Sequence, residues 1–108
     1  MKSLADLKRT IKPGLKIEHV ARMDTVCDVD GNRSLVEVPI PPKLKGVRTV
    51  TTVDTTGFYM SKDDTKGSFL GFPKASDLSF EAPDGTFTVL DRTKDGTIWL
   101  KMKYKIIT

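Results

Sequence analysis

The sequence predicts a mainly β (α+β) domain: a small, strongly bent antiparallel sheet or an open β-barrel with one short N-terminal helix. The clearest observation is that apolar side chains occupy every second position from Ile98 to Ile106. This period places them on one face of a strand, and no helix can do so. In addition, turn signals separate about seven short β-prone runs at a spacing typical of barrels and sandwiches. The shortness of the chain favours a bent sheet or open barrel over a two-sheet sandwich.

Length and composition indicate a single domain spanning residues 1–108. The chain is 38% hydrophobic and 30% charged, as is usual for globular proteins. It has no apolar run of about 20 residues that could span a membrane, and no signal-peptide stretch. Its single cysteine, Cys27, excludes an internal disulfide, and we expect it to be a buried small apolar group. We therefore expect a cytoplasmic protein that does not associate with membranes.

One helix is predicted at about residues 3–11. Ser3 and Asp6 have the spacing of an N-cap and an acid at the third helical position. Apolar residues then recur at helical spacing before Pro13 ends the pattern, namely Leu4, Leu7 and Ile11. Because so short a helix is unstable alone, its apolar face must dock on the sheet.

Seven strands are expected at about residues 15–22, 47–53, 58–61, 68–72, 78–81, 86–92 and 98–106. A polar loop at 62–67 and a turn at Pro83-Asp84-Gly85 separate the later ones.

Residues 24–46 form a weaker pattern. Asp30-Gly31-Asn32 is a turn signal between two β-prone runs, Thr25–Val29 and Leu35–Ile40. Prolines at 39, 41 and 42 cannot donate ladder hydrogen bonds, so a hairpin here lies at an edge and continues as an extended arm. The sequence leaves open whether this arm is ordered. Its exposed edge could recruit a second copy, which makes a homodimer compatible with the sequence.

No catalytic, metal-binding or cofactor-binding residues are predicted, and no cofactor is expected. Three side chains resemble the start of a calcium loop: Asp28, Asp30 and Asn32. The sixth position of such a loop requires glycine and the twelfth a bidentate acid, but Arg33 and Pro39 stand there. A turn with solvated acids is the better interpretation. His19 is the only histidine, and its inward strand position is more typical of packing than of catalysis.

The sharpest candidate site is a basic stripe of alternating residues on the last strand: Trp99, Lys101, Lys103 and Lys105. Three lysines at this spacing span about 13–14 Å, near the spacing of two or three phosphates, and a tryptophan can stack a base. The basic helix residues could extend this polyanion-binding face: Lys8, Arg9 and Lys12. The alternative is that the lysines prevent edge-to-edge aggregation and that the tryptophan only covers part of the core.

Four segments resemble, in order, small bacteriophage proteins: Leu4-Ala5-Asp6-Leu7-Lys8-Arg9, Arg48-Thr49-Val50-Thr51, Thr55-Thr56-Gly57-Phe58 and Phe72-Pro73-Lys74-Ala75-Ser76. The proteins in question are encoded by tailed phages and prophages and have no assigned function. The resemblance covers most of the chain except residues 24–46, which look like an insertion. It implies a compact β-rich protein acting in a bacterial host cytoplasm, and it carries over no site residues.

The leading hypothesis is therefore a non-catalytic interaction protein that binds a host or phage protein, such as a defence or replication factor. The alternative is a nucleic-acid-binding module that uses the basic stripe. An enzyme would require a cleft that joins His19 or Cys27 to carboxylates distant in the sequence.

Overall fold

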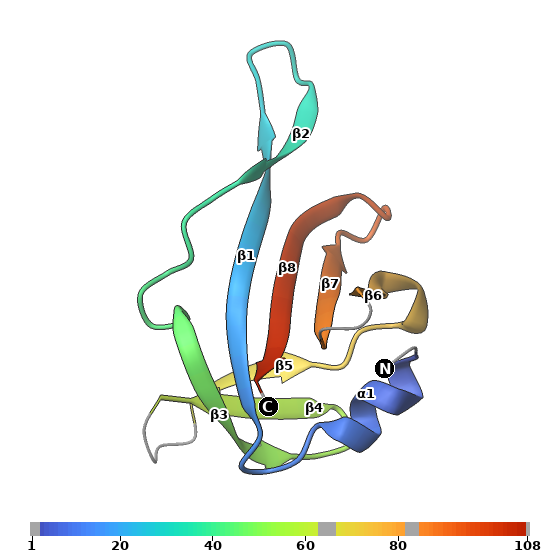
Figure 1. Ribbon diagram of the computed structural model, residues 1–108. Helices are drawn as coiled ribbons and strands as arrows, with labels where there is room; N and C mark the ends of the chain where they lie inside the picture. Colours follow the sequence, from blue (N-terminus) through green and yellow to red (C-terminus); the bar gives the residue numbers. More distant parts are fainter. Residues whose placement is uncertain (1–2, 63–66, 82–84, 108) are drawn as a thin grey trace.

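One antiparallel sheet contains all eight strands of the computed structural model, which describes residues 3–62, 67–81 and 85–107 (Figure 1). Its order is β5-β4-β3-β1-β8-β7-β6, and β2 pairs with β1 outside this path. The strands are β1 (Lys16–Cys27), β2 (Arg33–Glu37), β3 (Gly46–Val53), β4 (Gly57–Ser61), β5 (Ser68–Gly71), β6 (Leu78–Glu81), β7 (Thr86–Arg92) and β8 (Ile98–Ile107). The sheet is not closed, because its two end strands, β5 and β6, do not pair with each other in the described residues. The predicted mainly β fold with one short helix is confirmed.

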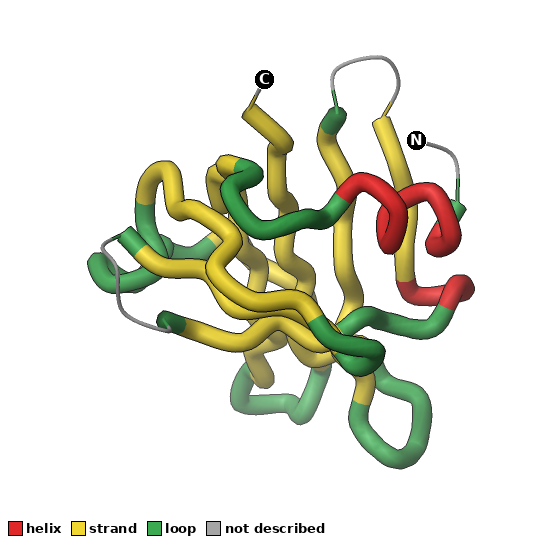
Figure 2. The backbone as a smooth tube through the Cα atoms, turned by 90° about the horizontal axis from the view of Figure 1, so that it is seen from below, coloured by secondary structure: helices red, strands yellow, loops and turns green. Residues whose placement is uncertain are grey.

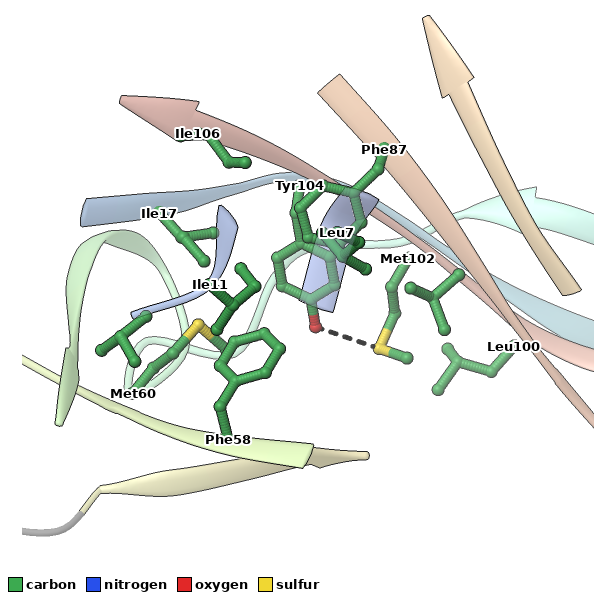
Figure 3. Packing of buried hydrophobic residues seen from close by; sticks show 12 residues of the cluster. Leu7, Ile11, Ile17, Phe58, Met60, Phe87, Leu100, Met102, Tyr104 and Ile106 are labelled. Carbon is green, nitrogen blue, oxygen red and sulfur yellow. Dashed lines mark hydrogen bonds between the residues drawn. The ribbon is translucent and has the colours of Figure 1, made fainter. Parts of the chain in front are cut away.

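The strand β8 lies in the interior of this sheet, between β1 and β7. Its alternate apolar side chains are buried, namely Leu100, Met102, Tyr104 and Ile106. They join the other buried residues in one core, in which Phe87 and Phe58 are the largest fully buried side chains (Figure 3). The period-two pattern thus identified both the strand and its buried face.

The strand β1 is longer than predicted. The sequence suggested one strand at 15–22 and a separate one from Thr25, but the twelve residues of β1 are continuous. Its first residues pair with β3 and its last ones with β2. A register shift between His19 and Ala21 marks a bulge opposite β8, and such a bulge reverses the alternation of the residues that follow it. As a result Arg22 lies opposite Met102, on the core side of the sheet.

The end of β1 and β2 form a hairpin that projects beyond the other strands (Figure 1). We call residues 23–37 the hairpin arm. The predicted hairpin is therefore present, with its second strand ending at Glu37, and the proline-containing segment after it leads to β3.

The helix α1 (Leu4–Thr10) matches the prediction closely. The Ser3 side chain accepts a hydrogen bond from the Asp6 backbone N–H at 3.2 Å, as expected for an N-cap. Leu7 and the adjacent Ile11 are buried in the core beside residues of β4 (Figure 3). The helix lies to one side of the strands in the view of Figure 2.

A short 3-10 helix, η1 (Ala75–Asp77), connects β5 to β6. Positions 63–66 and 82–84, where the sequence predicts a polar loop and most of a turn, lie outside the described residues.

Candidate functional site

The basic stripe lies in the middle of the outer face of the sheet, the face opposite the core. Trp99 is 45% exposed there, and the three lysines alternate with buried residues of β8. Both edges of β8 are hydrogen-bonded, to β1 and to β7. The interpretation of these lysines as protection of an exposed strand edge is therefore wrong.

Acidic residues from neighbouring strands share this outer face. The Lys103 ammonium forms an ion pair with Glu81 at 2.8 Å. Glu18 lies directly opposite Lys105 in the pairing of β1 with β8. Glu37 and Lys101 line the same shallow hollow, about 260 Å³ in volume. Each lysine of the stripe thus has a carboxylate among its neighbours, which weakens the positive potential of the face.

The structure does not bring the basic helix residues to the stripe. The helix packs against the core side of the sheet, whereas the stripe lies on the outer face. Arg9 forms an ion pair with Asp6 in the same helix. The Lys8 ammonium lies 5.5 Å from the centre of the Phe72 ring, and Lys12 is exposed. The predicted polyanion face is therefore divided between two sides of the molecule.

The hairpin arm exposes several apolar side chains. Val26, Val29 and Val36 are among the exposed large hydrophobic residues. Val26 lies opposite Ser34, and Val36 lies opposite Asp24, so the two valines share one face of the arm. Among the described residues β2 pairs only with β1, which leaves its other edge open.

The tip of the arm is a hydrogen-bonded turn. The Asp28 carboxylate accepts hydrogen bonds from the backbone N–H groups of Asp30 and Asn32, both at 2.9 Å. This geometry agrees with the turn interpretation of the acidic residues. Cys27 is exposed beside the turn, so the expectation that it is buried is wrong.

The core side of the sheet opens into a hollow of about 720 Å³, which we call the concave hollow. Strands β3 to β5 line one side of it, and β7 with β8 line the other. Its apolar lining includes Met60, Leu70, Phe72, Val89, Leu100 and Met102. Its charged lining consists of Arg22, Arg48, Lys74, Arg92 and Lys94 with Asp77 and Asp91.

Arg48 is the most unusual residue of this hollow. It lies on β3 opposite Ile17 and is only 3% exposed. Its Nε and Nη1 atoms have no hydrogen-bond partner, and no ion pair involves it among the residues that the structure describes. Burial lowers the pKa of the guanidinium group, and the neighbouring Tyr104 hydroxyl opposes this shift. A buried cation without a carboxylate partner is costly, which makes this a high-energy feature of the fold.

His19 and Tyr104 lie beside Arg48 in the core. Their rings are stacked with centroids 4.6 Å apart, and the Tyr104 hydroxyl donates to the Met102 sulfur at 3.4 Å (Figure 3). Burial first, then the charges of Arg48 and Arg22, lower the pKa of His19 to about 4. Burial also raises the pKa of Tyr104 to about 12. Both groups are therefore uncharged at neutral pH.

The pair of inward-facing arginines, Arg22 and Arg48, was not predicted from the sequence. Strand alternation places Arg48 on the same face as Val50, but the run itself does not show that this face is buried. Arg22 faces the core only because of the bulge in β1, which the sequence does not signal either.

In comparisons with known proteins, no protein-family model, no curated protein and no solved structure matches the chain. Within the described ranges no cluster of three or more His, Cys, Asp or Glu residues could hold a metal ion. No helix in the same residues is long and apolar enough to cross a membrane.

Proposed function

We propose that this protein acts by binding a host or phage protein through the hairpin arm and that it catalyses no reaction. The observation that carries the proposal is the arm itself, a hairpin that projects from the sheet with its valines exposed. The proposed setting is the bacterial cytoplasm, in line with the resemblance to phage proteins.

Two physical features of the arm support this proposal. Exposed apolar side chains grouped on a projecting element gain free energy when a partner removes them from water. The open edge of β2 also offers unpaired backbone groups, which a strand of the partner can extend by β-augmentation. The same edge could pair with that of a second copy, which would give a homodimer.

Replacing the arm valines is expected to weaken partner binding at least about tenfold. The variant combines Val26→Ser, Val29→Ser and Val36→Ser, which removes apolar contact area and leaves the charge unchanged. The measurement is affinity purification from a bacterial lysate followed by titration of the recovered partner. Light scattering of the purified protein over a range of concentrations tests for the homodimer.

The matched control is Val47→Ser, which changes an equally exposed valine on β3, outside the arm. It should bind the partner as the wild type does. Equal binding by the triple variant, or an equal loss in the Val47 variant, would refute a binding role for the arm.

A second candidate function is nucleic-acid binding through the basic stripe. The observation that favours it is the exposure of Trp99 on the same face as the three lysines. A base stacked on Trp99 would place its neighbouring phosphates along β8. The carboxylates of Glu18, Glu37 and Glu81 weigh against this function.

If the stripe binds single-stranded nucleic acid, reversing the charge of Lys101 and Lys103 to Glu should lower the affinity at least about tenfold. The slope of log affinity against log salt concentration should fall by about two, because two phosphate contacts are lost. The measurement is fluorescence anisotropy of labelled DNA and RNA oligonucleotides, with Trp99 quenching as a second signal. Lys8→Glu with Lys12→Glu makes the same change of charge away from the stripe, on the helix and just after it. An equal loss in both variants would indicate a response to net charge alone.

A further inference from the structure

The concave hollow combines an apolar lining with an excess of positive charge. Arg92 and Asp77 form an ion pair at 2.6 Å, so their charges cancel within the lining. Arg92 also donates to the Gly96 carbonyl oxygen at 2.9 Å. The remaining charged lining residues are four basic groups and one acid: Arg22, Arg48, Lys74 and Lys94 with Asp91. The hollow therefore has a net positive potential.

Arg48 supplies the strongest reason for an anionic ligand. Its side chain is almost fully buried in the wall of the hollow, and two of its three guanidinium nitrogens have no hydrogen-bond partner. Arg22 contributes a second guanidinium, whose only ion-pair contact in the described chain is a long one, 3.9 Å from its Nε to Asp24. A carboxylate or phosphate could accept charge-assisted hydrogen bonds from two such groups and offset the cost of burying them.

The rest of the lining is apolar and favours a ligand whose anionic group is attached to an apolar body. Leu70 and Phe72 come from β5 and the segment after it, and Leu100 and Met102 come from β8 on the other side. A volume of about 720 Å³ is within the range of pockets that hold small organic molecules, roughly 300–1,000 Å³. A simple inorganic ion would leave most of this apolar surface in contact with water.

We propose that the concave hollow binds a small amphiphilic organic anion, a carboxylate or phosphate joined to an apolar body, with the anionic group held by Arg48 and Arg22. This site is separate from the hairpin arm and does not depend on the function proposed for the arm.

A pair of fluorescent probes tests the proposal with the full-length protein. Anilinonaphthalene sulfonate carries an anionic group on an apolar ring system, and N-phenylnaphthylamine has nearly the same rings without the charge. The anionic probe should bind saturably at one site, with an affinity at least tenfold higher than that of the neutral probe. Equal affinities, or absence of saturable binding by the anionic probe, would overturn the proposal.

The variant Arg48→Met removes the buried charge and keeps a side chain of similar length. It should lower the affinity of the anionic probe at least tenfold and leave that of the neutral probe unchanged. Arg33→Met makes the same change at an exposed position of the arm and should alter neither affinity. Circular dichroism and thermal unfolding establish that each variant is folded. If Arg48→Met is not folded, Arg22→Met takes its place with the same expected result.

Two further measurements locate the probe and separate the ligand classes. The triple valine variant of the arm should bind the anionic probe unchanged, and a loss there would assign the probe to the arm and overturn the proposal. Displacement by octanoate and by octyl phosphate distinguishes a carboxylate from a phosphate site. Octanol should displace the probe at least tenfold less effectively than the better of these two anions, and equal displacement by octanol would again overturn the proposal.

Discussion

Lowering the pH from 7 to 4 will reduce the free energy of unfolding of the wild type by about 3 kcal/mol more than that of a His19→Leu variant. His19 is 2% exposed, and its pKa in the folded protein is lowered from 6.5 to about 4. Burial is the main cause, followed by the positive charges of Arg48 on β3 and Arg22 on β1. Tyr104 of β8, stacked on the imidazole ring, is uncharged in this range and does not compensate.

The direction of the effect follows from proton uptake by the two states. Between pH 6.5 and about pH 4 the unfolded chain binds a proton on His19 and the folded protein does not. Stability is therefore complete above the unfolded pKa of 6.5 and falls as the pH is lowered through this window. Protonation in the folded state would place a third positive charge beside two arginines.

Urea unfolding at several pH values measures the effect. The His19→Leu variant has a side chain of similar size and removes the titrating group, while every carboxylate remains in place. Subtracting the two pH profiles therefore isolates the contribution of His19. Parallel profiles between pH 7 and pH 4 would show that His19 titrates normally in the folded protein.

Local patterns in the sequence were sufficient to predict the strand β8 and the helix. The alternation from Ile98 to Ile106 reflects burial of one face of β8, and Ser3 with the spacing of Leu7 and Ile11 reflects capping and docking of α1. These features depend on residues close together in the chain, and their periods are directly visible.

The concave hollow could not be predicted in the same way. In the run Val47–Val53 both alternating sets mix apolar and polar residues, so the sequence does not show which set is buried. The structure buries Arg48 with Val50 because β3 pairs with β1 and β4, and this pairing is not encoded within the run. Arg22 faces inward only after the bulge in β1, and a bulge has no distinct sequence signal here.

The basic stripe illustrates a different limit of sequence reasoning. Its residues were correctly placed together on one face of a strand. Their electrostatic setting depends on the cross-strand register, which brings Glu81 to Lys103 and Glu18 to Lys105. The interior position of β8 likewise depends on the order of strands from both ends of the chain.

The pairing of β4 with β5, which positions one apolar wall of the concave hollow, is expected to depend on a glycine. Gly57 and Gly71 lie opposite each other in this pair. A Cβ atom on Gly57 would overlap the carbonyl oxygen of Leu70 and would lie 2.6 Å from the Phe69 ring. The Gly57 backbone is held in place, because its N–H donates to Asp54 at 3.0 Å and its carbonyl accepts from the Asp54 N–H at 2.9 Å. A side chain here can only be accommodated by moving β5.

Gly57→Ala should therefore lower the free energy of unfolding by about 2–3 kcal/mol, the upper part of the range for overpacked sites. Gly71→Ala is the matched control, since its Cβ would meet its nearest atom at an ordinary 3.5 Å. That variant should be neutral or slightly stabilising, because alanine restricts the unfolded chain more than glycine does. Urea unfolding of both variants measures the difference, and equal stability would contradict the close packing of β4 against β5. Leu70 and Phe72 are the chain neighbours of Gly71, which lies opposite Gly57, and both line the concave hollow. Moving β5 would displace them, so Gly57→Ala should also weaken binding of both fluorescent probes. Arg48→Met, in contrast, should affect the anionic probe alone.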